Sequence, residues 1–126
     1  MDKVQLGPLQ VTRLCLGAML MGGRTPPDEA HRLLDRFLDA GGNFIDTADT
    51  YNIWVPGHVG GESETVIGKW MKARDNRGKL IVATKVGMQM TPERTGLKPA
   101  HIRQSIDDSL KRLQTDYVDL YWSHKD

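Results

Sequence analysis

Apolar residues recur at the helical spacing i, i+3, i+4, i+7 in three segments of the chain. We predict helices from Pro26-Pro27-Asp28 to Gly41-Gly42, from Ser63 to about Ala73, and from Pro99 to about Gln114. The side chains expected to face inward are Ala30, Leu33, Leu34, Phe37 and Leu38, then Val66, Ile67, Trp70 and Met71, then Ile102, Ile106, Leu110 and Leu113. The paired glycines suit a left-handed C-cap, and Ser63 is predicted to be an N-cap.

Short apolar runs between these helices predict strands. Val4–Leu6 and Gln10–Arg13 flank Gly7-Pro8 and indicate a hairpin. The further strands are predicted at Leu14–Ala18, Asn43–Asp46, Leu80–Val86 and Tyr117–Ser123. The order is a hairpin followed by βαβαβαβ, which indicates an α/β fold with right-handed crossovers. A doubly wound sheet and a (β/α)₈ barrel both fit this order.

The polar residues at the strand ends favour the barrel. Asp46, Lys85 and His124 each lie at the C-terminal end of a different strand, where barrel enzymes carry their catalytic groups. We therefore predict an α/β TIM (β/α)₈ barrel, of which this chain supplies an N-terminal hairpin and the first four strands with three helices.

Each of these polar residues also has a purely structural interpretation. Asp46 alone suits a helix cap or a loop hydrogen bond, and Tyr51 suits packing with its hydroxyl in water. Lys85 follows an apolar strand expected to be covered on both faces, so it must reach solvent or meet an anion. His124 alone suits a structural role in which its ring is hydrogen-bonded within the protein. All four residues are expected at one rim of the barrel. A single shared site explains this placement better than four unrelated structural roles.

Four separated motifs resemble those of the aldo-keto reductases, in order and at the family's spacing. They read "LGAM", "FIDTADTY", "IVATKVG" and "SLKRLQTDYVDLYWSH", and the resemblance covers nearly all of the chain. By this resemblance Asp46, Tyr51, Lys85 and His124 are the catalytic residues. The resemblance also implies an NADP(H)-dependent oxidoreductase that reduces aldehydes or ketones to alcohols.

The same resemblance places part of a cofactor site in this chain. Gly17, Ala18 and Met19 correspond to the family's loop beside the nicotinamide ribose, and Asp46 is expected to contribute as well. Most residues that bind NADPH or NADP⁺ are expected in the second half of the barrel.

The residue types suit this chemistry. Reduction of a carbonyl builds negative charge on its oxygen, which needs a proton donor. A tyrosine hydroxyl ordinarily titrates near ~10 and gives up its proton slowly at neutral pH. An ammonium ~4 Å away, at an effective dielectric constant of ~20, contributes on the order of 4 kcal/mol and makes such a hydroxyl a stronger acid. We expect Lys85 to act on Tyr51 in this way and Asp46 to orient Lys85. His124 is expected either to bind the substrate oxygen or to relay the proton.

The length is short for the predicted barrel. Such a barrel needs about 250 residues, and the chain has 126. We therefore expect residues 1–126 to be the N-terminal half of an aldo-keto reductase domain within a longer enzyme. If the protein does end at Asp126, we expect weak cofactor binding. The alternatives are a non-catalytic regulatory or interaction barrel similar to potassium-channel β subunits, and a half-barrel that serves as an oligomerising scaffold.

The composition bears on the partners and the cellular location of the protein. A net charge of +1 gives no electrostatic footprint for nucleic acid or an anionic membrane. The apolar runs are too short to span a bilayer, and Met1-Asp2-Lys3-Val4 does not begin a signal peptide. The single cysteine, Cys15, cannot form an internal disulfide, and we predict a buried, unreactive thiol. We expect a cytoplasmic protein with a small carbonyl substrate and no nucleic-acid or membrane partner.

Three further features of the chain carry weaker functional signals. Gly57–Gly61 lacks the spacing of a phosphate loop and is predicted to be a plain loop. Trp54 suits either the substrate mouth or packing. His31 and His101 lack partners at ligand spacing, so no metal site is expected.

Overall fold

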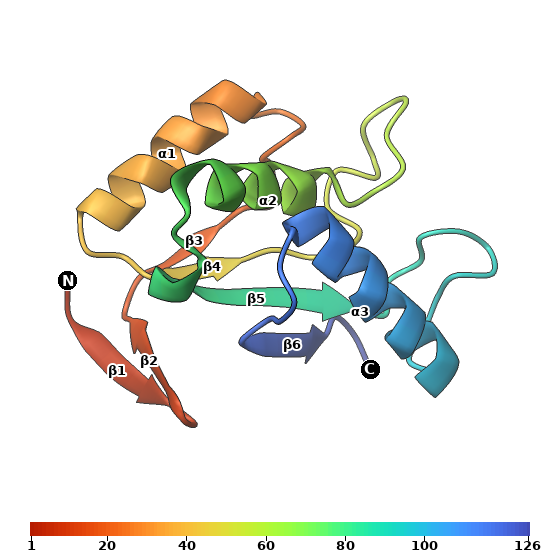
Figure 1. Cartoon of the computed structure of the whole chain (residues 1–126). Coiled ribbons are helices and arrows are strands. Elements are labelled where there is room, and N and C mark those ends of the chain that lie inside the picture. Colours follow the sequence, from red (N-terminus) through yellow and green to blue (C-terminus); the bar gives the residue numbers. More distant parts are fainter.

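A four-stranded parallel sheet forms the centre of the computed structural model, which describes residues 1–126 (Figure 1). Its strands, in spatial as well as sequence order, are β3 (Cys15–Gly17), β4 (Phe44–Asp46), β5 (Ile81–Val86) and β6 (Leu120–Ser123). All neighbouring pairs are parallel, so the C-terminal ends of the strands lie along one edge. The predicted alternation of strands and helices is confirmed.

The predicted hairpin is a separate two-stranded sheet. β1 (Lys3–Leu6) and β2 (Leu9–Thr12) pair antiparallel around Gly7, whose φ of 56° suits a glycine. Figure 1 shows the hairpin near the end of the sheet where the strands begin. Three hydrogen bonds to Asn43 attach it there: the Thr12 backbone amide donates to Asn43 Oδ1 at 2.8 Å, the Asn43 backbone amide donates to Thr12 Oγ1 at 3.3 Å, and Asn43 Nδ2 donates to the Gln10 carbonyl at 3.0 Å.

Three helices connect the parallel strands. They are α1 (Pro27–Asp39), α2 (Glu62–Arg74) and α3 (Pro99–Leu113), and a short 3₁₀ helix, η1 (Arg77–Lys79), precedes β5. Each predicted helix boundary lies within one or two residues of the observed one. The predicted left-handed glycine at the helix end is also confirmed, because Gly41, two residues after the end of α1, has a φ of 91°.

The hydrophobic core lies between the sheet and the helices. Trp70 of α2 is fully buried with Leu34 of α1, and Ile45 and Val82 reach them from the sheet. The indole Nε1 of Trp70 donates to Asp35 Oδ1 at 2.7 Å, which satisfies the one polar atom of this side chain.

The apolar stripes predicted for α1 and α3 need correction. On α1, Ala30 and Leu34 are buried, but Leu33 is 43% exposed. On α3, the fully buried positions include Ser105 and Ser109, whereas Ile102, Ile106 and Leu110 are only partly buried. The reason is that α3 packs against a polar layer, described below, which a count of apolar residues cannot reveal.

Helices α2 and α3 approach each other closely at Gly68. A Cβ at this position would lie 2.2 Å from the carbonyl oxygen of Arg112. Only glycine permits this crossing without displacement of a helix.

Strand β6 begins at Leu120, three residues later than predicted. Tyr117 does not extend the sheet, because its ring lies under the Arg77 guanidinium at 3.9 Å. The Asp119 carboxylate then accepts hydrogen bonds from Arg77 at 2.8 Å and from the Val82 amide at 2.8 Å.

The burial predicted for Cys15 is wrong: the residue is exposed. Cys15 lies on edge strand β3, where Leu16 packs against the core and Cys15 therefore points to the opposite, helix-free face. Local desolvation still raises the pKa of its thiol to about 11, with the negative charge of Asp46 adding to the effect. The thiol stays protonated at neutral pH, as expected for an unreactive cysteine.

Candidate active site

The Lys85 ammonium group connects three of the four predicted catalytic residues. Lys85 lies near the end of β5, and its Nζ donates to Asp46 Oδ2 at 2.6 Å and to the Tyr51 hydroxyl at 2.8 Å. Asp46 is the last residue of β4, which pairs with β5, and Tyr51 lies in the turn that follows. The side chain of Lys85 is 15% exposed, so the alternative in which it reaches into bulk solvent is wrong.

The hydrogen-bond directions show which proton is free. An ammonium group has three protons and no acceptor. Lys85 uses the third on the carbonyl oxygen of Thr47, at 2.8 Å. The Tyr51 oxygen therefore accepts from Lys85, and its own proton remains available to another acceptor. Tyr51 is therefore arranged as a neutral proton donor beside the fixed positive charge of Lys85.

His124 completes the group. Its ring meets that of Tyr51 edge to face, with 5.8 Å between the ring centroids. Its amide donates to the Val86 carbonyl at 2.8 Å, which fixes the residue just beyond β6. Burial lowers the pKa of His124, and the Lys85 charge lowers it further. The imidazole is therefore neutral at neutral pH and carries one N–H donor. The structure thus brings all four predicted residues together.

The predicted cofactor loop lies beside this group. Gly17 pairs with Asp46 across β3 and β4, and the Ala18 amide donates to the Asp46 carbonyl at 2.9 Å. Ala18 is fully buried, whereas Met19 is 47% exposed.

Two contributions to the site were not predicted from the sequence. The first is the Thr47 carbonyl that binds Lys85; a backbone oxygen has no signature in a residue pattern. The second is Ser63, predicted as the N-cap of α2. Gly61 occupies the cap position, and Ser63 lies inside the first turn, where its hydroxyl donates to the Ala18 carbonyl at 2.6 Å.

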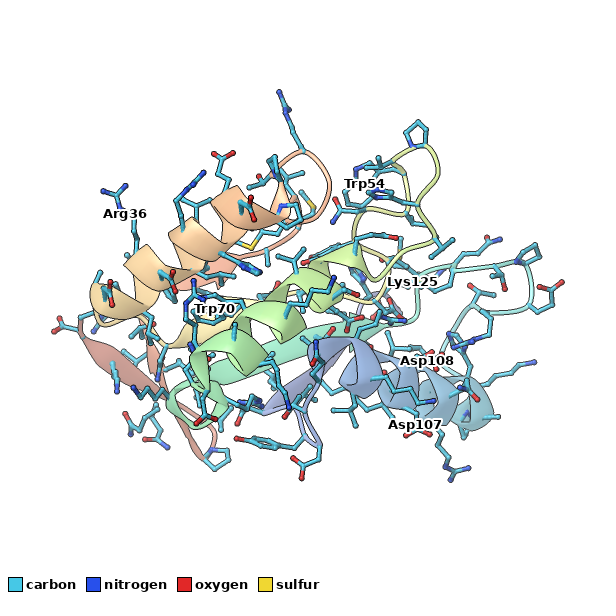
Figure 2. The ribbon with its side chains drawn as sticks, turned by 45° about the horizontal axis from the view of Figure 1, so that its top comes forward. Arg36, Trp54, Trp70, Asp107, Asp108 and Lys125 are labelled. Carbon is cyan, nitrogen blue, oxygen red and sulfur yellow. The ribbon has the colours of Figure 1, made fainter.

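Two amides of the glycine-rich loop are already used within the protein. The amides of Val59 and Gly60 both donate to the carboxylate of Glu62, at 3.1 Å each. The prediction that Gly57–Gly61 is a plain loop is therefore consistent with the structure. Figure 2 shows Trp54 on the loop after β4. It is 54% exposed and lies edge-on to Tyr51, with 6.4 Å between the ring centroids.

A buried polar layer lies behind the site, between the sheet and the helices. Glu64 of α2 is fully buried. It accepts from Thr84 Oγ1 at 2.7 Å and from Arg112 Nε at 2.8 Å, so its charge is paired. Sequence periodicity does not reveal such a layer, because its members come from two helices and a strand.

Asp49 belongs to the same layer but has no direct partner. It is 1% exposed, and neither carboxylate oxygen has a hydrogen-bond partner. It lines a cavity of about 140 Å³. The ionisable groups around it are Glu64 on α2, Arg94 in the loop before α3, Asp108 and Arg112 on α3, and Tyr121 on β6. Burial raises the pKa of Asp49 to about 7, the Glu64 charge adds to the rise, and Arg112 offsets only part of it.

We expect Asp49→Asn to reduce the pH dependence of stability. A carboxyl whose pKa is raised from 3.8 to about 7 keeps its proton in the folded state while the unfolded chain releases it. The folded state therefore loses stability as pH rises through this window, and the loss is complete above about pH 7. The melting temperature of Asp49→Asn relative to the unchanged chain should thus be higher at about pH 8 than at about pH 5.

Asp107→Asn is the matched control. Asp107 lies on the exposed side of α3 (Figure 2) and should not change the pH dependence. An equal difference in melting temperature at both pH values for Asp49→Asn would contradict the prediction.

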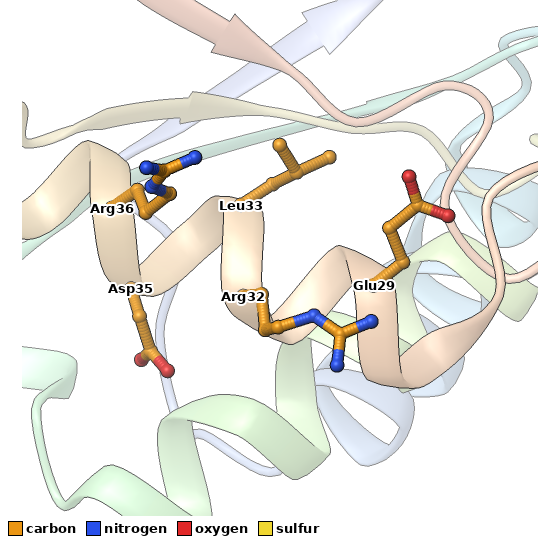
Figure 3. Close-up of a pocket in the computed structure, with 5 residues that line it drawn as sticks. All are labelled: Glu29, Arg32, Leu33, Asp35 and Arg36. Carbon is orange, nitrogen blue, oxygen red and sulfur yellow. The ribbon is translucent and has the colours of Figure 1, made fainter.

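The more open hollows of the surface lie elsewhere. A shallow one of about 480 Å³ runs along α1 and is lined by residues of that helix alone, Glu29, Arg32, Leu33, Asp35 and Arg36 (Figure 3). None of the four site residues lines it. No group of three or more histidine, cysteine or acidic side chains is arranged to hold a metal ion. None of the helices combines the length and the apolar character needed to cross a bilayer.

Comparison with known proteins supports the predicted fold. The chain is 41% identical to a solved aldo-keto reductase from Bacillus halodurans in its holo form, with a TM-score of 0.77 over 96% of this chain and 39% of that one. A putative aldo-keto reductase from Pseudomonas aeruginosa is 34% identical, with a TM-score of 0.79 over 98% of this chain and 47% of that one. The prediction of part of a (β/α)₈ barrel is confirmed.

Curated relatives include oxidoreductases. The chain is 42% identical to an aryl-alcohol dehydrogenase of Pestalotiopsis microspora, over 92% of this chain and 32% of the relative. It is 38% identical to an aryl-alcohol dehydrogenase [NADP(+)] of Phanerodontia chrysosporium, over 95% of this chain and 35% of the relative. The chain thus spans about a third of the length of these relatives.

The family match extends beyond the site itself. The model of the aldo/keto reductase family matches residues 13–126, which include every site residue described above. The chain therefore belongs to the aldo/keto reductase family.

Proposed function

We propose that the protein containing this chain is an NADP(H)-dependent reductase that converts aldehydes or ketones to alcohols. The observation that carries the proposal is the hydrogen bonding of Lys85, whose three donated bonds leave the Tyr51 proton free. A substrate carbonyl oxygen next to Tyr51 would receive that proton as negative charge develops on it. Lys85 would stabilise the phenolate that remains. His124, being neutral, would donate one N–H to the same oxygen.

The residues present fit part of a nicotinamide site. Nothing lies within 4 Å of the position that a Cβ on Gly17 would occupy, and Gly17 is paired with Asp46. A flat group can therefore approach the strand ends beside the Asp46 carboxylate. We propose that Gly17, Ala18, Met19 and Asp46 line the nicotinamide side of the cofactor. When bound, the reduced nicotinamide supplies the hydride.

We further propose that the carbonyl substrates are aromatic. Trp54 is more than half exposed beside Tyr51, and Trp122 is 43% exposed and paired with Lys85 across β5 and β6. Aromatic side chains on residues beside Tyr51 and Lys85 suit a flat aromatic ring. The aryl-alcohol dehydrogenases among the relatives support the same class. The single cysteine and this reductive chemistry favour the cytoplasm as the location.

The test is an assay of reduced-nicotinamide oxidation with benzaldehyde and, separately, a short aliphatic aldehyde. We expect turnover with NADPH and a higher kcat/KM for the aromatic aldehyde. Trp54→Ala should lower kcat/KM for benzaldehyde more than for the aliphatic aldehyde. Absence of turnover with any carbonyl compound would contradict the proposed function. Equal kcat/KM values for the two aldehydes would contradict only the substrate class.

A further inference from the structure

A closed ring of hydrogen bonds joins the loop after β3, the end of β4 and the first turn of α2. The Oγ1 of Thr47 lies 2.8 Å from the Oγ of Ser63, and Ser63 donates to the Ala18 carbonyl at 2.6 Å. The Ala18 amide donates to the Asp46 carbonyl at 2.9 Å. The peptide bond from Asp46 to Thr47 closes the ring.

The ring has a defined direction. A serine hydroxyl has one proton, and Ser63 gives it to the Ala18 carbonyl. The Thr47 hydroxyl must therefore donate to Ser63. Ala18, Thr47 and Ser63 are all completely buried, so water does not replace a missing partner. Loss of the Ser63 hydroxyl would leave the Thr47 hydroxyl and the Ala18 carbonyl without this partner, which is unfavourable in a buried place. Loss of the Thr47 hydroxyl would leave the Ser63 oxygen without a donor.

The ring contacts Lys85 through the backbone of Thr47. The Thr47 carbonyl is one of the three acceptors of the Lys85 ammonium. The Thr47 amide donates to the Ala83 carbonyl at 2.9 Å, and its hydroxyl is held by Ser63. Thr47 is thus fixed by hydrogen bonds on its amide, its carbonyl and its side chain.

Ser63 is itself held in place on both sides. Glu62 binds the amides of the preceding loop, and Glu64 binds Thr84 and Arg112. The first turn of α2 therefore cannot shift easily relative to β5 and α3. Because Ser63 is hydrogen-bonded to Thr47, it also restricts the movement of Thr47.

We propose that Thr47 and Ser63 are positioning residues, which hold the Lys85 ammonium against Tyr51 and link it to the loop that contains Ala18. Their effect on catalysis rests on the proposed function, but their effect on the Lys85 ammonium does not. Both hydroxyls belong to completely buried residues, so they act through the Thr47 carbonyl.

The direct test measures the Lys85 ammonium in the protein that contains this chain. Nitrogen-15-labelled lysine allows hydrogen exchange of the ammonium protons to be followed by NMR. Thr47→Val removes the hydroxyl with little change of shape, and Ser63→Ala removes the next link. Thr47→Val loses one hydrogen bond of the ring and Ser63→Ala loses two. We expect exchange at Lys85 to become about five- to tenfold faster in each variant, which corresponds to the free energy of about one hydrogen bond. Thr47→Ser keeps the hydroxyl and should exchange like the unchanged chain.

Thr65→Val is the matched control. Thr65 lies in the same turn of α2, but its hydroxyl donates to the Gly61 carbonyl at 3.1 Å, outside the ring. It should leave the exchange of Lys85 unchanged. The two substitutions change different residues. If Thr47→Val does not fold, Ser63→Ala still decides the question.

The second measurement is kcat and KM for carbonyl reduction. Thr47→Val and Ser63→Ala should lower kcat about five- to tenfold with little change in KM. Unchanged exchange at Lys85 in both variants would overturn the proposal, even if kcat fell. Faster exchange in a protein without carbonyl reductase activity would support the positioning role and contradict the proposed function.

Discussion

Replacement of Tyr51 by phenylalanine is expected to lower kcat for carbonyl reduction by ~10²–10⁴-fold, the usual loss for a missing general acid. The change keeps the ring that His124 and Trp54 contact, and removes only the hydroxyl. No other hydroxyl hydrogen-bonds to the Lys85 ammonium, so no substitute donor stands beside that charge.

Affinity for NADPH should change little, because the lost proton acts on the substrate oxygen. The measurements are kcat with benzaldehyde and cofactor affinity from fluorescence titration. Tyr117→Phe provides the control: it removes a phenolic hydroxyl at a site that is 44% exposed and should retain full activity. Near-normal turnover by Tyr51→Phe would show that another group is the acid.

Lys85→Met is expected to lower kcat. Without the ammonium group, no positive charge beside Tyr51 stabilises the negative charge that develops on its oxygen as the proton is transferred. The reaction rate should therefore fall, and kcat is measured with a simple aldehyde. A rate that matches that of the unchanged protein would contradict the role given to Lys85.

The same substitution should reduce stability. It leaves the Asp46 carboxylate, 26% exposed, without its partner, and the loss is expected to be about 1–3 kcal/mol. The double variant Lys85→Met/Asp46→Asn should regain part of this stability, because it removes the unpaired charge, but none of the activity. Denaturant unfolding measures the first effect and the aldehyde assay the second. Lys69→Met, an exposed position on α2, should change neither quantity.

The sequence alone predicted the order of the elements and the location of the site. The helix ends at Gly41 and Pro99 follow from local rules of glycine and proline geometry, which depend on few neighbours. The site was predictable because parallel strands end at one edge of a sheet. Asp46, Lys85 and His124, each within one residue of the end of a different strand, must then lie near one another.

The faces of the elements were predicted less well. Leu33 on α1 is exposed, against the expected stripe. Ser105 on α3 is buried because α3 meets charged side chains instead of an apolar core. Cys15 is exposed because it lies on edge strand β3 and points to the face of the sheet that no helix covers. Exposure of this kind depends on what packs against an element, which its own sequence does not contain.

The tertiary structure alone decided how the site is held. The ring through Thr47, Ser63 and Ala18 joins residues up to 45 positions apart in the sequence. The unpaired Asp49 carboxylate is also a consequence of packing, since its desolvation comes from surrounding elements. Periodicity and motifs locate side chains along a chain, whereas hydrogen bonds between distant segments and backbone carbonyls depend on distances that only the folded chain defines. For this reason the sequence determined which residues form the site, and the fold decided which groups hold them in place.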